Sequence, residues 1–383
     1  MEDTVETESY PWSVPYDDGS TGVEVEDTSS GTVITEPFNP TLIRVNPIPM
    51  NIDLLLRRIA QKALDLSPGF QRKGGIWTKE AQSRLIESTL VRIPISTIYV
   101  DATDEDRWLI VDGLQRLTAL KRFVIDGELR LCGLEFLTQF NGAAYSDLPL
   151  RLKRRILETQ IFVYAIQEGT PPDVKFNIFK RINTGGLPLS AQEIRHALNQ
   201  GKATDFLGRI AGSREFLEAV ARGISDKRMA AQECVLRFAA FTLTPYAAYL
   251  MSDLDGFLNE AMARMNRMPD SEIAGLEDRF LRAMDAARDL FGRDAFRKKY
   301  RAGETERYPI NKALFEAWSV NLGRLSNDQI QVLTQRREAL MERFIALMNQ
   351  QDFNEAVSQG TGDVSKVAKR FGEIERIIRE VLA

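Results

Sequence analysis

The stretch VDGLQRLTAL, residues 111–120, joins an apolar run to a helical pattern through an acid and a glycine. Residues 107–112 predict a strand and residues 115–125 predict an amphipathic helix, so a strand-to-helix corner lies between them. The start of a helix offers free backbone N–H groups and the positive end of its dipole, and both attract phosphate. Asp112, Gln115 and Arg116 therefore lie where an anion is favoured.

Each polar residue of this corner has a chemical interpretation. Gly113 lets a ligand approach the backbone closely, and Arg116 carries a planar fork that fits phosphate oxygens. Gln115 is able to orient a water or a base edge, and Asp112 is able to hold Mg²⁺ or cap the helix. The alternative is an ordinary helix start, in which Asp112 is the N-cap and the other two side chains are solvated. In both interpretations Arg116 is expected to be partly exposed.

The residues around this corner predict an α/β region. Helical patterns cover residues 51–64, with Asn51 as N-cap, and residues 78–92. Residues 95–101 and 107–112 predict a β-hairpin, and residues 161–166 predict a further strand. Helices follow at 171–182 and at 190–201, where Ser190 and Glu193 form a capping box.

Beyond residue 202 the strand patterns fade and helical patterns follow one another. They cover residues 226–250, 252–268, 270–292, 310–323, 326–349 and 363–382. We therefore predict an α+β fold with three parts: an acidic disordered tail over 1–40, an α/β domain over 41–201, and an all-helical domain over 202–383.

Charge is divided unevenly along the 383 residues. The first 36 residues contain ten acidic residues and no Lys or Arg, which leaves 44 acidic against 50 basic residues in the rest. The tail is interpreted either as a solubilising segment or as a segment for a specific partner. The rest of the chain is basic enough to meet a polyanion, although the sequence pI of about 5.5 argues against a strongly basic binder.

Several protein classes are disfavoured. The single histidine, His196, and the two separated cysteines, Cys132 and Cys234, exclude a Cys/His zinc site. We expect both thiols to be reduced and His196 to lie on a helix surface. There is no apolar run of about 20 residues and the N-terminus is acidic, so we expect a cytoplasmic protein without a membrane partner.

Three further segments carry polar residues near glycines or at a helix start. FQR places Gln71 and Arg72 in a Gly/Pro loop, and EIR (193–195) lies on the capped helix. RINTGG places Arg181, Asn183 and Thr184 beside paired glycines. Each also has an ordinary structural interpretation as a turn or a helix cap.

Taken together, three segments resemble one known family: FQRKGGIWTKEAQSRLIESTLVRIPISTIYV, VDGLQRLTAL and FNIFKRINTGGLPLSAQEIRHAL. They are similar to the N-terminal module of GmrSD-type restriction endonucleases, which carries a DGQQR corner in a ParB/sulfiredoxin-like fold. The resemblance covers about residues 42–200. It extends more loosely to DKRMAAQECVLRF and INKALFEAW in the helical part.

The resemblance implies binding and hydrolysis of a nucleoside triphosphate, tied to recognition of foreign DNA. It assigns catalysis to Asp112, Gln115 and Arg116, with Asp112 also assisting Mg²⁺. It assigns nucleotide binding to Gln71, Arg72, Gly113, Arg181, Asn183 and Thr184. Position 114 is Leu where the family has its first glutamine, so binding is expected more firmly than turnover. There is no Walker A lysine motif.

Full-length relatives carry an HNH nuclease domain that needs histidines. Because His196 lies in a predicted helix of the N-terminal half, we expect DNA cleavage, if the system performs it, to reside in a separate chain. The alternative function is a non-enzymatic DNA-binding or regulatory module with a degenerate NTP site. Its candidate contacts lie in two basic clusters, 151–155 and 297–301, and include Arg154, Arg155, Lys298 and Lys299. Both clusters are equally compatible with solvated helix faces. A nuclease acting by itself is the weakest of the three interpretations.

Overall fold

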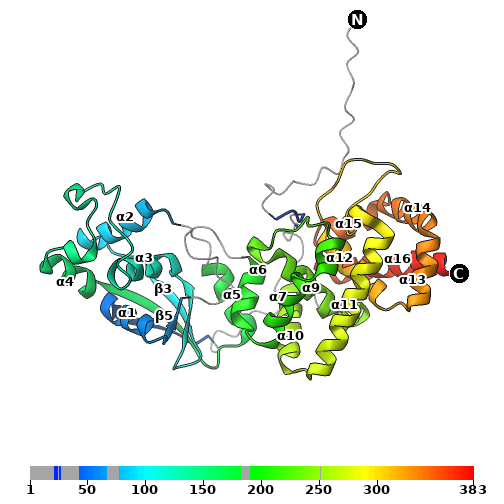
Figure 1. The fold of residues 1–383 in the computed structure, drawn as a ribbon. Coiled ribbons are helices and arrows are strands. Elements are labelled where there is room, and N and C mark those ends of the chain that lie inside the picture. The colour runs from blue at the N-terminus through cyan, green and yellow to red at the C-terminus, as the bar shows by residue number, and fades with distance from the viewer. Residues whose placement is uncertain (1–20, 25, 27–42, 67–76, 183–189, 251) are drawn as a thin grey trace, which may run out of the picture. The chain divides into compact units, whose positions relative to one another are not determined.

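The computed structural model describes residues 21–24, 26, 43–66, 77–182, 190–250 and 252–383 (Figure 1). They form two compact units, divided between Leu198 and Asn199. The described residues from Ile43 to Leu198 make an α/β unit. Those from Asn199 to Ala383 make a helical unit, which also includes the described residues of the N-terminal segment. The fold is therefore α+β, as the sequence predicts.

The α/β unit is built on one five-stranded mixed sheet with the strand order β1-β5-β3-β4-β2. β1 is antiparallel to β5, β3 is parallel to β5 and antiparallel to β4, and β2 is parallel to β4. The strands are β1 (Val45–Asn51), β2 (Leu64–Asp65), β3 (Ile98–Ala102), β4 (Trp108–Asp112) and β5 (Gln160–Gln167). The hairpin predicted from residues 95–112 is the antiparallel pair of β3 and β4.

Helices cover both faces of this sheet. Side chains alternate between faces along a strand, so neighbouring residues enter different cores. Ile98, Val100 and Ile110 pack with α1 (Ile52–Ala60), α2 (Lys79–Leu90), α3 (Leu114–Val124) and α4 (Leu150–Glu158). On the other face, Val111 and Ile166 pack with α5 (Pro172–Ile182) and α6 (Ala191–Leu198). The corner between β4 and α3 therefore connects a strand that is covered on both sides to a helix of the larger core.

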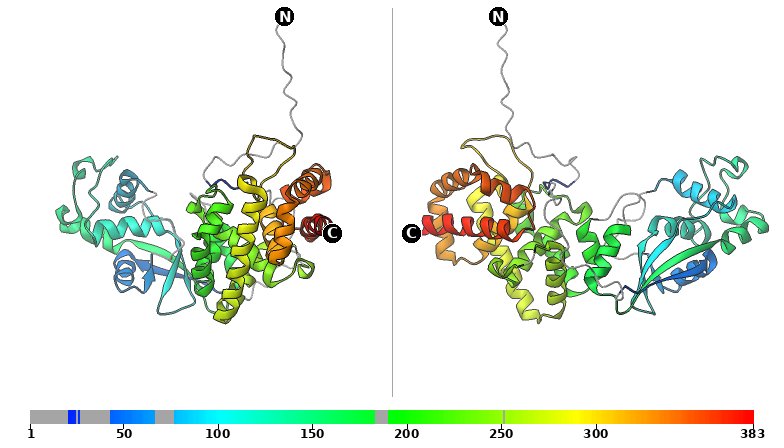
Figure 2. Two further views of the ribbon diagram at one scale, coloured as in Figure 1. Left: turned by 45° about the vertical axis from the view of Figure 1, so that its right-hand side comes forward. Right: turned by 180° about the vertical axis from the view of Figure 1, so that it is seen from behind.

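Ten α-helices of the described residues form the helical unit: α7 (Lys202–Ala211), α8 (Arg214–Ala219), α9 (Ala230–Leu243), α10 (Leu254–Arg267), α11 (Asp270–Phe291), α12 (Lys312–Gly323), α13 (Asn327–Gln335), α14 (Arg337–Met348), α15 (Gln351–Ser358) and α16 (Val364–Leu382). Figure 2 shows this unit from two further sides, with α16 in red. α12 is central, because every residue from Ala313 to Gly323 is buried. In the described part of the chain no helix is long and apolar enough to cross a membrane.

The N-terminal segment differs from its prediction. The prediction of a disordered tail over residues 1–40 is wrong for Thr21–Glu24 and Glu26, which pack against the helical unit. Val23 pairs with Ile310 in an isolated parallel bridge, and both are buried. Glu24 is buried as well and binds Lys298. A glutamate in a sequence is predicted to lie on the surface, but its carboxylate can be buried when buried cations pair with it.

Candidate functional site

The corner between β4 and α3 is held in shape by its glycine. Gly113 has a φ of 103° and is the N-cap residue of α3. A Cβ atom built on Gly113 would lie 2.9 Å from Cγ1 of Ile98, so both the backbone angle and the space require glycine. The strand therefore turns sharply into the helix, and the backbone at this turn stays bare of side chain.

Arg116 stabilises the corner through hydrogen bonds to three neighbouring residues. Its Nη2 donates to Oδ2 of Asp112 at 2.6 Å. Its Nη1 donates to the carbonyl oxygens of Ser96 and Thr97 at 2.6 and 2.9 Å, and also contacts the Ser96 hydroxyl. These oxygens belong to the chain that leads into β3. Arg116 thus ties the start of α3, the end of β4 and the approach to β3 into one unit.

The Arg116 side chain is 11% exposed, against 30% for Asp112, so the arginine is partly exposed as predicted, although most of its surface is covered. One expectation about the corner is corrected: Asp112 is not the helix cap, because α3 has no side-chain cap and Asp112 is held by Arg116 instead. We therefore regard Arg116 as a residue that positions Asp112.

The remaining groups at the corner are available to a ligand. Because α3 has no side-chain cap, the first backbone N–H groups of the helix are not used by a capping side chain. The half-buried side chain of Gln115 makes no hydrogen bond to the described residues, and neither does Oδ1 of Asp112. Leu114, the position at which the sequence resemblance leads us to expect glutamine, is partly buried and packs against the larger core. The corner thus offers N–H donors, an amide and one carboxylate oxygen.

The other predicted nucleotide-binding residues are placed only in part. Gln71, Arg72, Asn183 and Thr184 lie outside the described residues. β2, the last described strand before FQR, is parallel to β4 and pairs Leu64 with Trp108 and Asp65 with Leu109. Arg181 lies exposed in the last turn of α5. The structure brings Asp112, Gly113, Gln115 and Arg116 together and leaves the other contributions as predictions.

The two basic clusters are not equivalent. On α4, Arg151 and Arg154 are exposed, while Arg155 donates to the carbonyl oxygen of Leu90 at 2.6 Å. In the helical unit Lys298 is buried, and Lys299 pairs with Asp294. A fully buried lysine that already neutralises a glutamate is not available to a phosphate, so Lys298 is not a surface contact in this structure. A solvated helix face fits 151–155 and does not fit 297–301.

A buried ion pair that the sequence analysis missed lies on the other face of the sheet. Lys175 of α5 contacts both carboxylate oxygens of Asp101 at 3.2 and 3.3 Å, and each residue is 8% exposed. The Thr103 hydroxyl contacts both partners. The pair fastens α5 to β3. The signal was present in the sequence, because Lys175 lies four residues before the buried Phe179 and so shares its helix face.

The capping box predicted for the following helix is confirmed. Ser190 N–H donates to the Glu193 carboxylate at 2.6 Å, and Glu193 N–H donates to the Ser190 hydroxyl at 3.1 Å. Arg195 on the same helix is buried and lies 5.5 Å from the centre of the Phe176 ring. His196 is half-buried, in contrast to the predicted surface position. The EIR segment therefore serves the packing of α6 on α5.

The fold and the corner define an α/β domain in which a glycine turn, held by an Asp–Arg pair, opens a helix. Residues 53–199 match the family model of the GmrSD restriction endonuclease N-terminal domain, which confirms the resemblance seen in the sequence. The match spans most of the α/β unit, includes the whole corner, and covers less than half of the chain. The search of curated proteins and the search of solved structures each returned no match. The matched family model is named for restriction endonucleases.

Proposed function

We propose that this chain is a nucleotide-binding component of a restriction or anti-phage defence system, and that the DGLQR corner is its NTP site. The observation that carries the proposal is the bare turn at Gly113, which leads into a helix without a side-chain cap. This turn lies inside the segment that matches the GmrSD N-terminal domain. We further infer that the mixed sheet of this domain is a ParB/sulfiredoxin-like variant.

Phosphate binding is assigned first to the backbone. The N–H groups at the start of α3 supply donors, and the dipole of this eleven-residue helix adds partial positive charge there. The lack of a side chain at Gly113 allows a phosphate to approach the turn closely. Such binding does not depend on the base, which is why the corner by itself does not distinguish GTP, ATP, CTP and UTP.

Asp112 supplies the negative group of the site. Oδ2 is neutralised by Arg116, and Oδ1 makes no hydrogen bond to the described residues. Mg²⁺ in nucleotide sites takes one or two carboxylates together with phosphate oxygens and waters, so one such oxygen fits it. Among the described residues no group of three or more His, Cys, Asp and Glu converges, which also fits a shared rather than an all-protein site. When bound, Mg²⁺ would neutralise phosphate charge.

Arg116 is assigned a positioning role, so other cationic side chains must neutralise the phosphate charge. Its guanidinium already donates to Asp112 and to the carbonyl oxygens of Ser96 and Thr97. We therefore assign phosphate neutralisation by side chains to Arg72 and Arg181. Gln71, Asn183 and Thr184 are proposed as the further polar groups of the same pocket.

Hydrolysis requires a group that orients the attacking water. Gln115 is proposed for this role, because its amide is half-buried at the corner and makes no hydrogen bond to the described residues. Leu114 supplies no polar group. Nucleotide binding is therefore proposed more firmly than rapid turnover.

Coupling to DNA completes the proposal. The similarity to restriction endonucleases makes foreign DNA the proposed partner, and cleavage is proposed to reside outside these 383 residues, whose only histidine is His196. NTP and invading DNA meet in the cytoplasm, which is the proposed location.

The test is a titration of the purified chain with each of the four NTPs in the presence of Mg²⁺, together with an assay of phosphate release. At least one nucleotide is expected to bind, and Asp112→Asn and Gln115→Ala are each expected to weaken binding or turnover about tenfold, or about 1.4 kcal/mol. The matched control is Gln61→Ala, an exposed glutamine at the end of α1. Failure of all four nucleotides to bind would refute the proposal.

Two observations favour the second candidate, a DNA-binding or regulatory module with a degenerate NTP site. Arg151 and Arg154 are exposed on α4, while Leu114 interrupts the family pattern of the corner. This candidate predicts DNA binding that weakens with salt and is lost when Arg151 and Arg154 are both changed to Glu. Salt-dependent DNA binding without any nucleotide binding would select it over the NTP site.

A further inference from the structure

The helical unit binds the described N-terminal residues Thr21–Glu24 and Glu26 in the manner of a peptide ligand. We call these residues the strap. Ser225 N–H donates to the carbonyl oxygen of Thr21 at 2.8 Å. Ile310 N–H donates to the carbonyl oxygen of Gly22 at 3.1 Å and its own carbonyl accepts from Glu24 N–H at 2.8 Å. An extended segment that adds to an exposed strand-like edge by main-chain hydrogen bonds is a recurring mode of peptide recognition.

The helical unit makes side-chain-specific contacts with three consecutive residues of the strap, Gly22, Val23 and Glu24. A Cβ atom on Gly22 would lie 1.8 Å from the carbonyl oxygen of Gly223, and Gly22 has a φ of 72°, so only glycine fits. Val23 follows and is 3% exposed. The carboxylate of the next residue, Glu24, accepts hydrogen bonds from Lys298 Nζ at 2.7 Å and from the Asn311 side-chain amide at 3.0 Å. The contacts therefore select the sequence pattern G-V-E.

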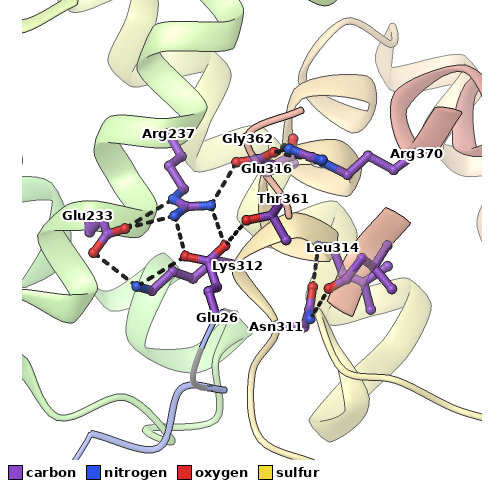
Figure 3. Close-up of polar contacts among 12 residues, drawn as sticks. Glu26, Glu233, Arg237, Asn311, Lys312, Leu314, Glu316, Thr361, Gly362 and Arg370 are labelled. Atoms are coloured by element: carbon purple, nitrogen blue, oxygen red, sulfur yellow. Dashed lines mark hydrogen bonds and ion pairs between the residues drawn. The ribbon is translucent and has the colours of Figure 1, made fainter. Parts of the chain in front are cut away.

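Glu26 adds the second carboxylate (Figure 3). It faces both terminal nitrogens of Arg237, with Nη1 at 2.9 Å, and accepts from the Thr361 hydroxyl at 2.8 Å. Lys312 Nζ lies 3.6 Å away. A carboxylate held by both ends of a guanidinium is recognised by geometry as well as by charge. We use the word groove for the residues of the helical unit that contact the strap, and the sequence pattern that fits them becomes G-V-E-x-E.

The charges of the helices are incomplete without the strap. Four cationic side chains meet in this region, namely Arg237, Lys298, Lys312 and Arg370. Two carboxylates of the helices, Glu233 and Glu316, pair with these cations. Glu24 and Glu26 of the strap supply two more carboxylates. Removing acids from such a set would leave buried cations uncompensated, at a large cost in free energy. The groove is therefore built for an acidic segment.

Along the chain, the strap is connected to the helices that bind it only through residues 27–198. Residues 27–44 lie between Glu26 and Val45, where β1 of the other unit begins. The strap reaches its groove from a part of the chain remote in sequence from Asn199–Ala383. A connection of this length gives an intramolecular ligand a high effective concentration without making its binding permanent.

We propose that this groove is a peptide-binding site for an acidic segment of the pattern G-V-E-x-E, and that the strap occupies it as an exchangeable ligand in cis. The site lies wholly in the helical unit and does not depend on nucleotide binding at the corner. Its specificity rests on the backbone contacts of Ile310 and on Arg237 and Lys298.

The test begins with the full chain, folded and carrying a protease site inserted between Ser29 and Ser30. After cleavage, the N-terminal fragment is expected to co-elute with the remainder in size-exclusion chromatography. It is then expected to be exchanged by a fluorescent peptide of residues 18–29, followed by fluorescence anisotropy. Peptides carrying Glu26→Gln or Gly22→Ala should bind at least about tenfold more weakly.

The matched control is Glu342→Gln, introduced in the chain at an exposed carboxylate of α14, which should leave fragment retention and peptide exchange unchanged. Circular dichroism of the remainder monitors its fold throughout. Three results would overturn the proposal: immediate loss of the wild-type fragment, equal affinity of the Glu26→Gln and wild-type peptides, or exchange that occurs only when the remainder unfolds. The last result would make the strap an ordinary part of the core.

Discussion

Arg116 and Asp112 form a hydrogen-bonded ion pair at 2.6 Å, in which the arginine side chain is 11% exposed and Oδ1 of the aspartate makes no hydrogen bond to the described residues. Arg57 and Asp53 have the same spacing in sequence and pair at 2.9 Å, yet their side chains are 70% and 37% exposed. The two pairs share residue types and differ in burial. The largely buried pair of Arg116 and Asp112 holds the corner in shape, whereas the exposed pair of Arg57 and Asp53 lies on the surface.

The first prediction uses this difference. Arg116→Ala removes the donors of Asp112, Ser96 and Thr97 together, so we expect the free energy of unfolding to fall by about 2 kcal/mol. Arg57→Ala breaks an exposed pair and should change it by less than about 0.5 kcal/mol. Urea denaturation followed by circular dichroism measures both. Equal effects of the two substitutions would show that Arg116 does not hold the corner.

The second prediction concerns Gly113. Gly113→Ala places a methyl group at a positive φ and against Ile98, and should destabilise the fold by about 1–3 kcal/mol. Gly275→Ala is the control, because Gly275 lies exposed inside α11 with open space around it. This second change should stabilise by up to about 1 kcal/mol, since alanine favours the helix. Thermal melts that show the same sign for both variants would contradict the account.

The sequence predicted the corner more successfully than its chemistry. A strand, a glycine and an amphipathic helix were readable because their patterns are local, and β4 and α3 are where those patterns place them. The contacts of Arg116 with Ser96 and Thr97 were not readable, because these partners lie about twenty residues away. Contacts across such separations depend on how strands pair rather than on the sequence around one residue.

Three further elements escaped prediction for different reasons. β1 contains Pro47 and Pro49, which argue against a strand, but it is an edge strand where missing N–H groups are tolerated. α4 appeared only as a basic segment, because only Leu152 and Ile156 of this helix are buried. The strap was hidden by its acidic residues, whose partners Arg237 and Lys298 are more than two hundred residues distant.

The third prediction concerns pH and Glu87. The carboxylate of Glu87 is buried, and burial by itself raises its pKa. The backbone N–H groups of Glu135, Leu137 and Phe136 donate to the carboxylate, and together they lower the pKa by more than burial raises it. The pKa of Glu87 therefore lies below its ordinary value. A carboxyl with a lowered pKa in the folded state stabilises the fold above its unfolded pKa of about 4.3. This stabilisation is lost as the pH falls through the lowered value.

Glu87→Gln should therefore destabilise the protein by about 1–3 kcal/mol at pH 7, because its amide presents donors to backbone donors. The difference from the unmodified chain should shrink as the pH falls below about 4. Glu105→Gln, at an exposed position in the hairpin turn, should show no difference at either pH. A pH-independent effect of Glu87→Gln would contradict the role assigned to the ionised carboxylate.

The fourth prediction concerns the residue that departs from the family pattern. Leu114→Gln supplies the missing amide, and we expect phosphate release to rise severalfold while nucleotide affinity changes little. Leu114→Met is the control, because it keeps the volume and apolar character of a side chain that packs on the core. Turnover that is the same in both variants would show that position 114 does not limit hydrolysis.

The most direct test of the central claim is a crystal structure of the chain with its preferred nucleotide, in slowly hydrolysed form, and Mg²⁺. We expect phosphate oxygens about 3 Å from the backbone nitrogens at the start of α3, with Asp112 still paired to Arg116. A nucleotide bound elsewhere, with the turn at Gly113 free of phosphate, would contradict it.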